Sequence, residues 1–239
     1  MTTHTTALIT GATQGLGAET AARLAERSWT VWLGARDVAA GEAVAKEIRG
    51  AHPDADPRVV QLDVTDDQSV AAAYDAVLEA DTGLDVLVNN AGISGTRALP
   101  ADTKPADFVP VFGVNLLGPV RVTNTFLPLL QKSEWPRLVM VSSGMGSFEI
   151  TLDRARLEST LWGIVYPSSK AALNMVTTMY AKSLPDVRVT AVDPGYTATN
   201  LNGFTGTQTL AEGVEPIVEA CVAEELPGWF IGRSGLLPW

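Results

Sequence analysis

The segment YPSSK, from Tyr166 to Lys170, places a phenol and an ammonium four residues apart at the start of an apolar helical run. Side chains at this spacing lie on one face of a helix, so both can act on the same ligand. A tyrosine phenol has an ordinary pKa near ~10, and a neighbouring positive charge lowers that pKa by favouring the phenolate. The pair therefore predicts a proton donor or acceptor, Tyr166, with a pKa lowered by Lys170. The alternative is an ordinary surface pair on a helix.

A glycine-rich segment, TGATQGLG, follows the first apolar run of the chain and has glycines at positions 11, 15 and 17. Glycine lets the backbone turn sharply and approach a pyrophosphate without a clash at Cβ. A helix that begins at Gly17 offers free N–H groups and the positive end of its dipole to phosphates. The segment predicts a dinucleotide site, and the alternative is a plain glycine turn.

Short apolar runs alternate with helical spacing along the whole chain. The runs are near-continuously apolar, which is typical of parallel strands covered on both faces. We expect strands at Ala7–Thr10, Val31–Ala35, Val59–Asp63, Asp85–Asn90, Arg137–Ser143, Val187–Asp193 and Trp229–Ile231. We expect helices at Ala18–Arg27, Ala39–Arg49, Asp67–Glu79, Asp107–Gln131, Ser168–Ser183 and Leu210–Ala223. The pattern predicts an α/β Rossmann fold, one domain over residues 1–239, with a doubly wound parallel sheet of about seven strands and helices on both faces.

The composition narrows the class of protein. Apolar residues make up 46% and charged residues 18% of the 239 residues, which favours one folded domain over a disordered chain. The net charge of −10 argues against nucleic acid as a partner. No apolar run approaches the roughly 20 residues that span a bilayer, so we expect no membrane insertion. The stretch MTTHTTALIT lacks the pattern of a secretory signal, so the expected compartment is the cytoplasm. A lone cysteine, Cys221, excludes a Cys-cluster metal site, and we expect no metal.

The glycine turn has the spacing Gly-x-x-x-Gly-x-Gly, and further motifs follow it in order. They are NNAG at Asn89–Gly92, Asn115 in FGVNLLGP, the pair Ser142–Ser143, YPSSK, and PGYTAT at Pro194–Thr199. In order and spacing these motifs resemble the short-chain dehydrogenase/reductase family over nearly the whole chain. The stretch between Ser143 and Tyr166 is longer than the commonest family spacing. This resembles the carbonyl-reductase branch, which carries insertions before the catalytic tyrosine.

The resemblance implies a catalytic set of Asn115, Ser143, Tyr166 and Lys170. Tyr166 would give its proton to the substrate carbonyl oxygen, which Ser143 would hold by a hydrogen bond. Lys170 would also bond the nicotinamide ribose, and Asn115 would hold a water that links Lys170 to solvent. Ser142 stays open as an alternative to Ser143. The implied cofactor-binding residues are Gly11, Thr13, Gln14, Gly15, Leu16, Gly17, Arg36, Asp63, Val64, Asn90, Ala91, Gly92, Tyr166, Lys170, Pro194, Gly195, Thr197 and Thr199.

The end of the second expected strand bears on which nicotinamide cofactor binds. A carboxylate there would favour NAD, but the family position is Ala35 and the next residue is Arg36, whose guanidinium can pair with the 2′-phosphate of NADP. This favours NADPH/NADP⁺ over NADH. The alternative is a surface Arg36 paired with Asp37 or Glu42, and Gln14 stands where many NADPH-using relatives carry a second base. By the resemblance Asp63 would accept from the adenine amino group with Val64 against the ring; alternatively, Asp63 caps a turn.

The substrate walls are expected in three segments that follow strands. The residues are Ile93, Ser94, Gly95, Met145, Phe148, Ile150, Leu157, Trp162, Tyr196, Leu201 and Phe204. Because most of them are apolar, the leading hypothesis is an NADPH-dependent reductase of a mostly apolar ketone or aldehyde. The alternatives are an NAD-dependent secondary-alcohol dehydrogenase and a non-catalytic NADP(H)-binding redox sensor. A monomer, a homodimer and a homotetramer all stay open.

Overall fold

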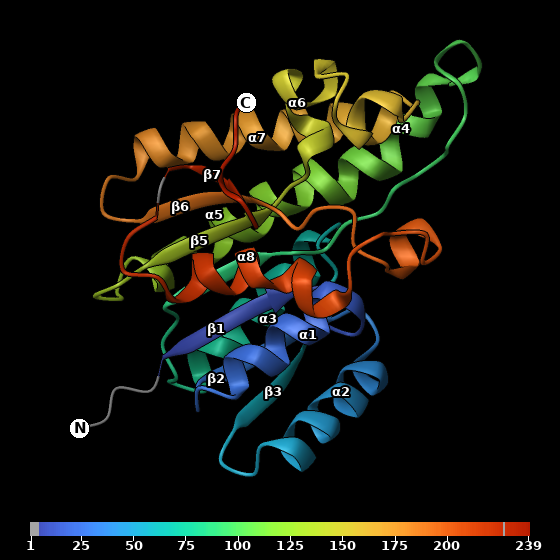
Figure 1. Cartoon of the computed structure of the whole chain (residues 1–239). Helices are drawn as coiled ribbons and strands as arrows, with labels where there is room; N and C mark the ends of the chain where they lie inside the picture. Colours follow the sequence, from blue (N-terminus) through green and yellow to red (C-terminus); the bar gives the residue numbers. More distant parts are fainter. Residues whose placement is uncertain (1–4, 227) are drawn as a thin grey trace.

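The computed structural model describes residues 5–226 and 228–239, which form an eight-stranded sheet with helices on both faces (Figure 1). The first four residues of the N-terminal stretch MTTHTTALIT lie outside these ranges. The strands are β1 (Thr6–Thr10), β2 (Thr30–Ala35), β3 (Asp56–Gln61), β4 (Val86–Asn89), β5 (Arg137–Val141), β6 (Arg188–Asp193), β7 (Phe230–Gly232) and β8 (Gly235–Leu236). Their order is β3-β2-β1-β4-β5-β6-β7-β8, in which β7 and β8 pair antiparallel and all the other pairs are parallel.

The helices bury one apolar layer on each face of the sheet. They are α1 (Gly15–Ala25), α2 (Val38–Ala51), α3 (Asp67–Glu79), α4 (Pro105–Phe112), α5 (Gly118–Leu130), α6 (Phe148–Leu152), α7 (Val165–Ser183) and α8 (Leu210–Val222). One core cluster joins Ile9 of β1 to α1, α2 and α8, and the other joins Leu8 of β1 to α3, α5 and α7. Figure 1 shows α1 and α8 in front of the sheet and α3 behind it. Neighbouring residues of β1 thus supply opposite cores, as a strand covered on both faces requires.

The predicted strands and the doubly wound order are confirmed, with two differences. The pair Gly235–Leu236 adds a short antiparallel edge strand that was not predicted, because two residues carry no recognisable strand pattern. The strand β3 begins at Asp56 and ends at Gln61, so Asp63 lies two residues beyond the strand rather than at its end. Among the described residues, no helix is both long enough and apolar enough to cross a membrane.

The single helix predicted over Asp107–Gln131 is wrong in its middle. Helix α4 ends at Phe112, a π-helical turn covers Gly113–Leu117, and α5 starts at Gly118. Pro119 has no N–H to donate and therefore interrupts the regular hydrogen-bond ladder at this point. Single π-turns of this kind are frequent at functional sites, and this one contains Asn115.

The long connection before Tyr166 folds against the last strands. It contains α6, whose first turn is capped by Ser147 accepting from the Ile150 N–H at 3.1 Å. The Ile150 side chain packs with Ala191, Phe230 and Leu237 in a small separate core. A 3₁₀ turn at Leu157–Thr160 then leads toward α7. The insertion is therefore an ordered part of the fold beside the start of α7.

The β1–α1 turn needs glycine for two different reasons. Gly11 and Gly15 have φ values of +64° and +55°, in the left-handed region that favours glycine. Gly17 is packed tightly instead, since a Cβ there would lie 2.4 Å from the Gly11 oxygen and 2.5 Å from Asn90 Nδ2. The Asn90 amide donates to the Thr10 oxygen at 2.8 Å and thereby ties β4 to this turn.

We predict that Gly17→Ala lowers the free energy of unfolding by about 3 kcal/mol, because the added methyl group must displace backbone and the Asn90 amide. Gly50→Ala is the matched control in α2, since nothing lies within 4 Å of a Cβ at Gly50. The control should stabilise the protein slightly, by at most about 1 kcal/mol. Urea unfolding followed by tryptophan fluorescence measures both, and equal midpoints for the two variants would contradict the packing argument.

Candidate active site

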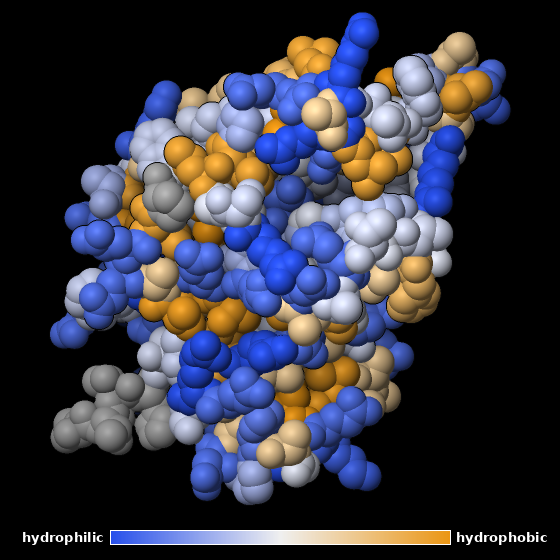
Figure 2. Space-filling view, viewed as in Figure 1, coloured by the Kyte–Doolittle hydropathy of each residue, from blue (hydrophilic) through white to orange (hydrophobic). Residues whose placement is uncertain are grey.

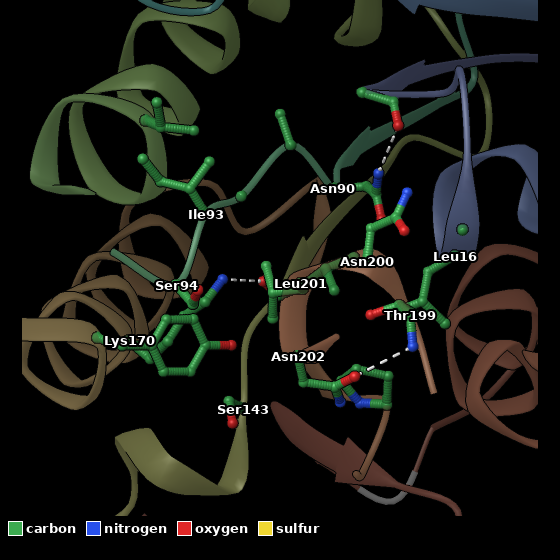
Figure 3. A pocket seen from close by; sticks show the side chains of 18 of the residues that line it. Leu16, Asn90, Ile93, Ser94, Ser143, Lys170, Thr199, Asn200, Leu201 and Asn202 are labelled. Atoms are coloured by element: carbon green, nitrogen blue, oxygen red, sulfur yellow. Dashed lines mark hydrogen bonds between the residues drawn. The ribbon is translucent and has the colours of Figure 1, made fainter. Parts of the chain in front are cut away.

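A cavity of about 730 Å³ opens at the carboxyl ends of the strands. It is lined by the segments that follow β1 to β6 and by the first turn of α7, as expected for an open parallel sheet. Figure 3 shows Ser94 and Lys170 on one side of the view, Leu16 and Asn90 on the other, and Leu201 between them. Every residue predicted to bind the cofactor lines this cavity. The motifs far apart in sequence therefore meet in one place.

The glycine turn forms one end of the cavity and is joined to the segment after β6. The Asn200 amide donates to Gln14 Oε1 at 2.6 Å, and the Thr199 side chain lies 3.8 Å from the position a Cβ would take at Gly15. The sequence interpretation did not include Asn200, although it directly follows the PGYTAT motif. This bond joins Gln14 to the segment after β6 at this end of the cavity.

Arg36 lies at the exposed rim of the cavity, and its proposed alternative partners are engaged elsewhere. Asp37 accepts from the Ala39 and Ala40 N–H groups at 2.9 and 3.2 Å as the N-cap of α2. Glu42 pairs with Arg49 at 3.7 Å. Within residues 5–226 and 228–239, no carboxylate lies within ion-pair distance of Arg36. The guanidinium is therefore available to a ligand.

The structure shows one of the two roles that the sequence left open for Asp63, that of a turn cap. Its Oδ1 accepts from the Thr65 N–H at 2.9 Å and from the Thr65 hydroxyl at 2.7 Å, which caps the turn after β3. These two bonds lower the pKa of Asp63, and the positive charge of Arg36 lowers it further. Both bonds use Oδ1, so Oδ2 remains on a side chain that lines the cavity.

Tyr166 and Lys170 lie together at the opposite end of the cavity, as their spacing predicts. The Lys170 ammonium is 5.7 Å from the centre of the Tyr166 ring and donates to the Val141 oxygen at 2.8 Å. Lys170 is only 4% exposed. Helix α7 begins at Val165, so both side chains come from its first two turns. The helix therefore fixes one group against the other and against the end of β5.

The predicted lowering of the Tyr166 pKa is wrong for the protein's own groups. Burial raises the pKa of Tyr166 to about 12; the Ser143 hydroxyl lowers it and the charge of Asp193 raises it. Burial also lowers the pKa of Lys170 to about 8, against the raising effect of Asp193. Desolvation disfavours both charged forms, and for Tyr166 it outweighs the lowering by the Ser143 hydroxyl.

The two serines after β5 have different surroundings. Ser142 is 2% exposed, and its hydroxyl donates to the Asn174 side chain. This hydroxyl therefore bonds inside the protein. Ser143 accepts a hydrogen bond from the Met145 N–H at 3.2 Å. Its hydroxyl also faces the Tyr166 phenol oxygen and favours the phenolate form of Tyr166. This geometry favours Ser143 as the serine that meets a ligand.

Asn115 lies behind the cavity wall and is completely buried. Its Oδ1 accepts from the Ile93 N–H at 2.9 Å, and its amide donates to the Ile93 oxygen at 2.9 Å and to Ser169 Oγ at 3.0 Å. The side chain thus connects the segment after β4 to α7. A Cβ at Gly92 would lie 3.5 Å from Asn115 Oδ1 and 3.8 Å from Lys170 Nζ, so both groups border the same small space.

Four residues expected in the substrate walls do not line the cavity. Phe148 is 75% and Phe204 64% exposed, Leu157 lies on the outer side of the insertion, and Ile150 packs in the small core. The expectation assigned them by nearness in sequence, which does not tell which face of α6 or of a loop is covered. The other expected wall residues line the cavity together with Leu161, Val114 and Asn202, which were not predicted.

Comparison with known proteins agrees with this architecture. The family model for short chain dehydrogenase matches residues 5–209. The chain is 36% identical over 221 residues to the short-chain dehydrogenase anuI of Penicillium roqueforti, covering 89% of this chain and 86% of the relative. It is 30% identical to (−)-isopiperitenone reductase of Mentha piperita, with 97% of each chain covered. The structure of an NADPH-bound carbonyl reductase from chicken fatty liver superposes with a TM-score of 0.84 at 25% identity, covering 99% of each chain. The chain belongs to the short-chain dehydrogenase family of oxidoreductases.

Proposed function

We propose that this oxidoreductase uses NADPH to reduce the carbonyl group of a mostly apolar ketone or aldehyde, with Tyr166 as the proton donor. The observation that carries the proposal is the meeting of Ser143, Tyr166 and Lys170 in the cavity that the glycine turn also lines. A phosphate-binding turn alone would fit many nucleotide proteins. The half-buried phenol and the buried ammonium beside it are what a proton transfer to a carbonyl oxygen requires. We take residues 1–239 as one catalytic domain.

The protonation states support the reductive direction. With a pKa of about 12, Tyr166 holds its proton at neutral pH and is ready to donate it. With a pKa of about 8, Lys170 is largely an ammonium at neutral pH. As the phenol gives up its proton, the ammonium 5.7 Å from the ring and the Ser143 hydroxyl stabilise the phenolate that forms. The groups thus favour the transition state of proton donation over the resting phenol.

Ser143 and Asn115 would have supporting roles. Ser143 is placed to donate a hydrogen bond to the same carbonyl oxygen that receives the proton from Tyr166. Asn115 Oδ1 and Lys170 Nζ border the space beside Gly92, which is suited to a polar link that returns protons to Tyr166 through Lys170. Because the Asn115 amide already holds Ile93 and Ser169, its main contribution is to keep these segments in place.

The charged rim supports NADPH as the cofactor. Arg36 lines the cavity without a carboxylate partner among the described residues, which leaves it free for a 2′-phosphate. Bound NADPH supplies the hydride that the carbonyl carbon receives. Gly11, Gly15 and Gly17 would cradle its phosphates, Asp63 and Val64 the adenine, and Thr197 and Thr199 the nicotinamide end. The carbonyl reductase from chicken fatty liver, whose structure contains NADPH, supports the same choice.

Asp37 favours a second candidate, an NAD-dependent secondary-alcohol dehydrogenase. Its carboxylate also lines the cavity, next to Arg36, and a carboxylate there can bond a ribose that carries no phosphate. However, Asp37 already caps α2 through Ala39 and Ala40, so we place this function second.

The walls support an apolar substrate. Ile93, Met145, Leu161, Trp162 and Leu201 line the cavity, and Trp162 is 74% exposed. Figure 2 shows hydrophobic residues in separate groups among hydrophilic ones on this face of the molecule. The (−)-isopiperitenone reductase and a (+)-neomenthol dehydrogenase of Arabidopsis thaliana, which is 30% identical, are named for cyclic apolar compounds. We therefore propose cyclic or aromatic ketones as the first compounds to offer.

We predict that Tyr166→Phe lowers kcat for ketone reduction by about 10²- to 10⁴-fold, because the proton donor is removed. NADPH oxidation followed at 340 nm with a panel of cyclic ketones and aldehydes measures this loss. Tyr180→Phe is the matched control on the same helix, since its hydroxyl bonds Asn124 at 2.7 Å outside the cavity. Turnover that survives Tyr166→Phe would contradict the proposed role. Tight NADPH binding with no turnover across the panel would point to the redox-sensor alternative.

We predict that Arg36→Ala raises the Kd for NADPH by about 10- to 100-fold and leaves the Kd for NADH unchanged, since only NADPH carries the 2′-phosphate. Calorimetric titration of both cofactors measures the preference. Arg49→Ala is the control, because Arg49 donates to the Pro57 oxygen at 2.7 Å and does not line the cavity. An unchanged preference in Arg36→Ala would favour the NAD-dependent candidate.

A further inference from the structure

Two carboxyl groups meet behind the loop that carries Ser143. Asp193 is the last residue of β6, and Glu158 comes from the 3₁₀ turn of the insertion. A Cβ at Gly144 would lie 3.1 Å from Asp193 Oδ2 and 3.2 Å from Glu158 Oε1. The two carboxyl groups therefore flank the same methyl-sized space. Neither is among the described residues that line the cavity, so neither is placed to touch a ligand.

Asp193 connects the two loops that frame the catalytic end of the cavity. Its Oδ1 accepts from the Gly195 N–H at 3.0 Å, and the Gly144 N–H also donates to this carboxylate. Gly144 directly follows Ser143, and Gly195 belongs to the turn expected to hold the nicotinamide end. One side chain thus fixes the serine relative to the turn after β6.

The charge of Asp193 reaches the proton-transfer groups. It raises the pKa of both Tyr166 and Lys170, because a nearby negative charge favours the protonated form of each. Burial raises the pKa of Asp193 itself, and the two N–H groups lower it. Two residues of the insertion shift the pKa of Asp193 in opposite directions: Glu158 raises it and Arg156 lowers it.

We propose that Asp193 is a positioning residue that holds the two loops in register and adds to the proton affinity of Lys170 and Tyr166, and that Glu158 of the insertion tunes the charge of Asp193. The catalytic consequence rests on the proposed reductase function, whereas the electrostatic linkage does not. The charge of Asp193 acts on Tyr166 and Lys170 of α7. The charges of Arg156 and Glu158 of the insertion act on Asp193. Through this pair, Glu158 of the insertion acts on the active site although neither carboxyl group lines the cavity.

The direct test is an NMR titration of Lys170 in the chain without substrate. Selective ¹³C labelling of lysine gives one signal per lysine, and the signal missing in Lys170→Met identifies Lys170. In Asp193→Asn, which keeps an oxygen for the Gly195 N–H, the Lys170 titration should move to a lower pH than the parent value of about 8. An unchanged or raised Lys170 midpoint in a variant with unaltered thermal unfolding would overturn the proposal.

A second variant tests the insertion and does not depend on whether Asp193→Asn folds. With ¹³C-labelled aspartate carboxyl groups, Glu158→Gln should lower the titration midpoint of Asp193, because a like charge has been removed. Glu149→Gln is the matched control, an exposed glutamate of α6 in the same insertion. Equal aspartate titrations in Glu158→Gln and Glu149→Gln would overturn the role given to Glu158.

Turnover then links this electrostatic effect to catalysis. In Asp193→Asn the alkaline fall of kcat should begin at lower pH, since both Lys170 and Tyr166 lose their protons more readily. In Glu158→Gln the alkaline fall should stay in place. An unmoved alkaline limb in Asp193→Asn would overturn the catalytic part of the proposal. Absence of turnover in the parent chain at every pH would instead count against the reductase function and leave the NMR result standing.

Discussion

The whole site depends on one constraint, the burial of the Lys170 ammonium beside the Tyr166 phenol at the end of β5. Removing an ammonium or a phenolate from water costs free energy. Burial therefore lowers the pKa of Lys170 to about 8 and raises the pKa of Tyr166 to about 12. The Val141 oxygen gives Lys170 one fixed acceptor, and Ser143 gives the phenol oxygen one fixed neighbour. A phenol that is protonated at rest and stabilised as it ionises is suited to donating a proton.

The fold satisfies this constraint by bringing loops from separate strands against the start of α7. Parallel pairing puts the ends of β4, β5 and β6 at one edge of the sheet, where Asn115, Ser143 and Asp193 each hold a loop. Helix α7 comes close because Gly146 has no side chain, since a Cβ there would lie 2.6 Å from the Lys170 backbone carbon. At the other end of the cavity a glycine also allows close approach, since Gly17 leaves room for Asn90 to bond the glycine turn.

Sequence reasoning predicted the elements well, and it predicted many of the residues that line the cavity, because both follow from local patterns. The chain shows the apolar runs, the glycine spacing and the pair Tyr166–Lys170 directly. Where these features lie in the fold depends only on the topology of the sheet. Sequence reasoning missed the features of the site that depend on three-dimensional packing. The direction of the Tyr166 pKa required knowing how deeply the phenol is buried, and the π-turn at Asn115 required the bonds to Ile93. Asp193 carries no motif of its own, and only the folded chain brings Glu158 of the insertion near it.

Burial, opposed by the Ser143 hydroxyl, sets the proton affinity of Tyr166 in the protein alone. The most direct measurement is the pH titration of tyrosinate absorbance at 295 nm, with and without saturating NADP⁺, as the difference between the parent chain and Tyr166→Phe. We predict a high midpoint for Tyr166 in the protein alone and a clearly lower one with NADP⁺, whose positive nicotinamide favours the phenolate. A midpoint that NADP⁺ leaves unchanged, or an ordinary tyrosine midpoint in the protein alone, would contradict this prediction.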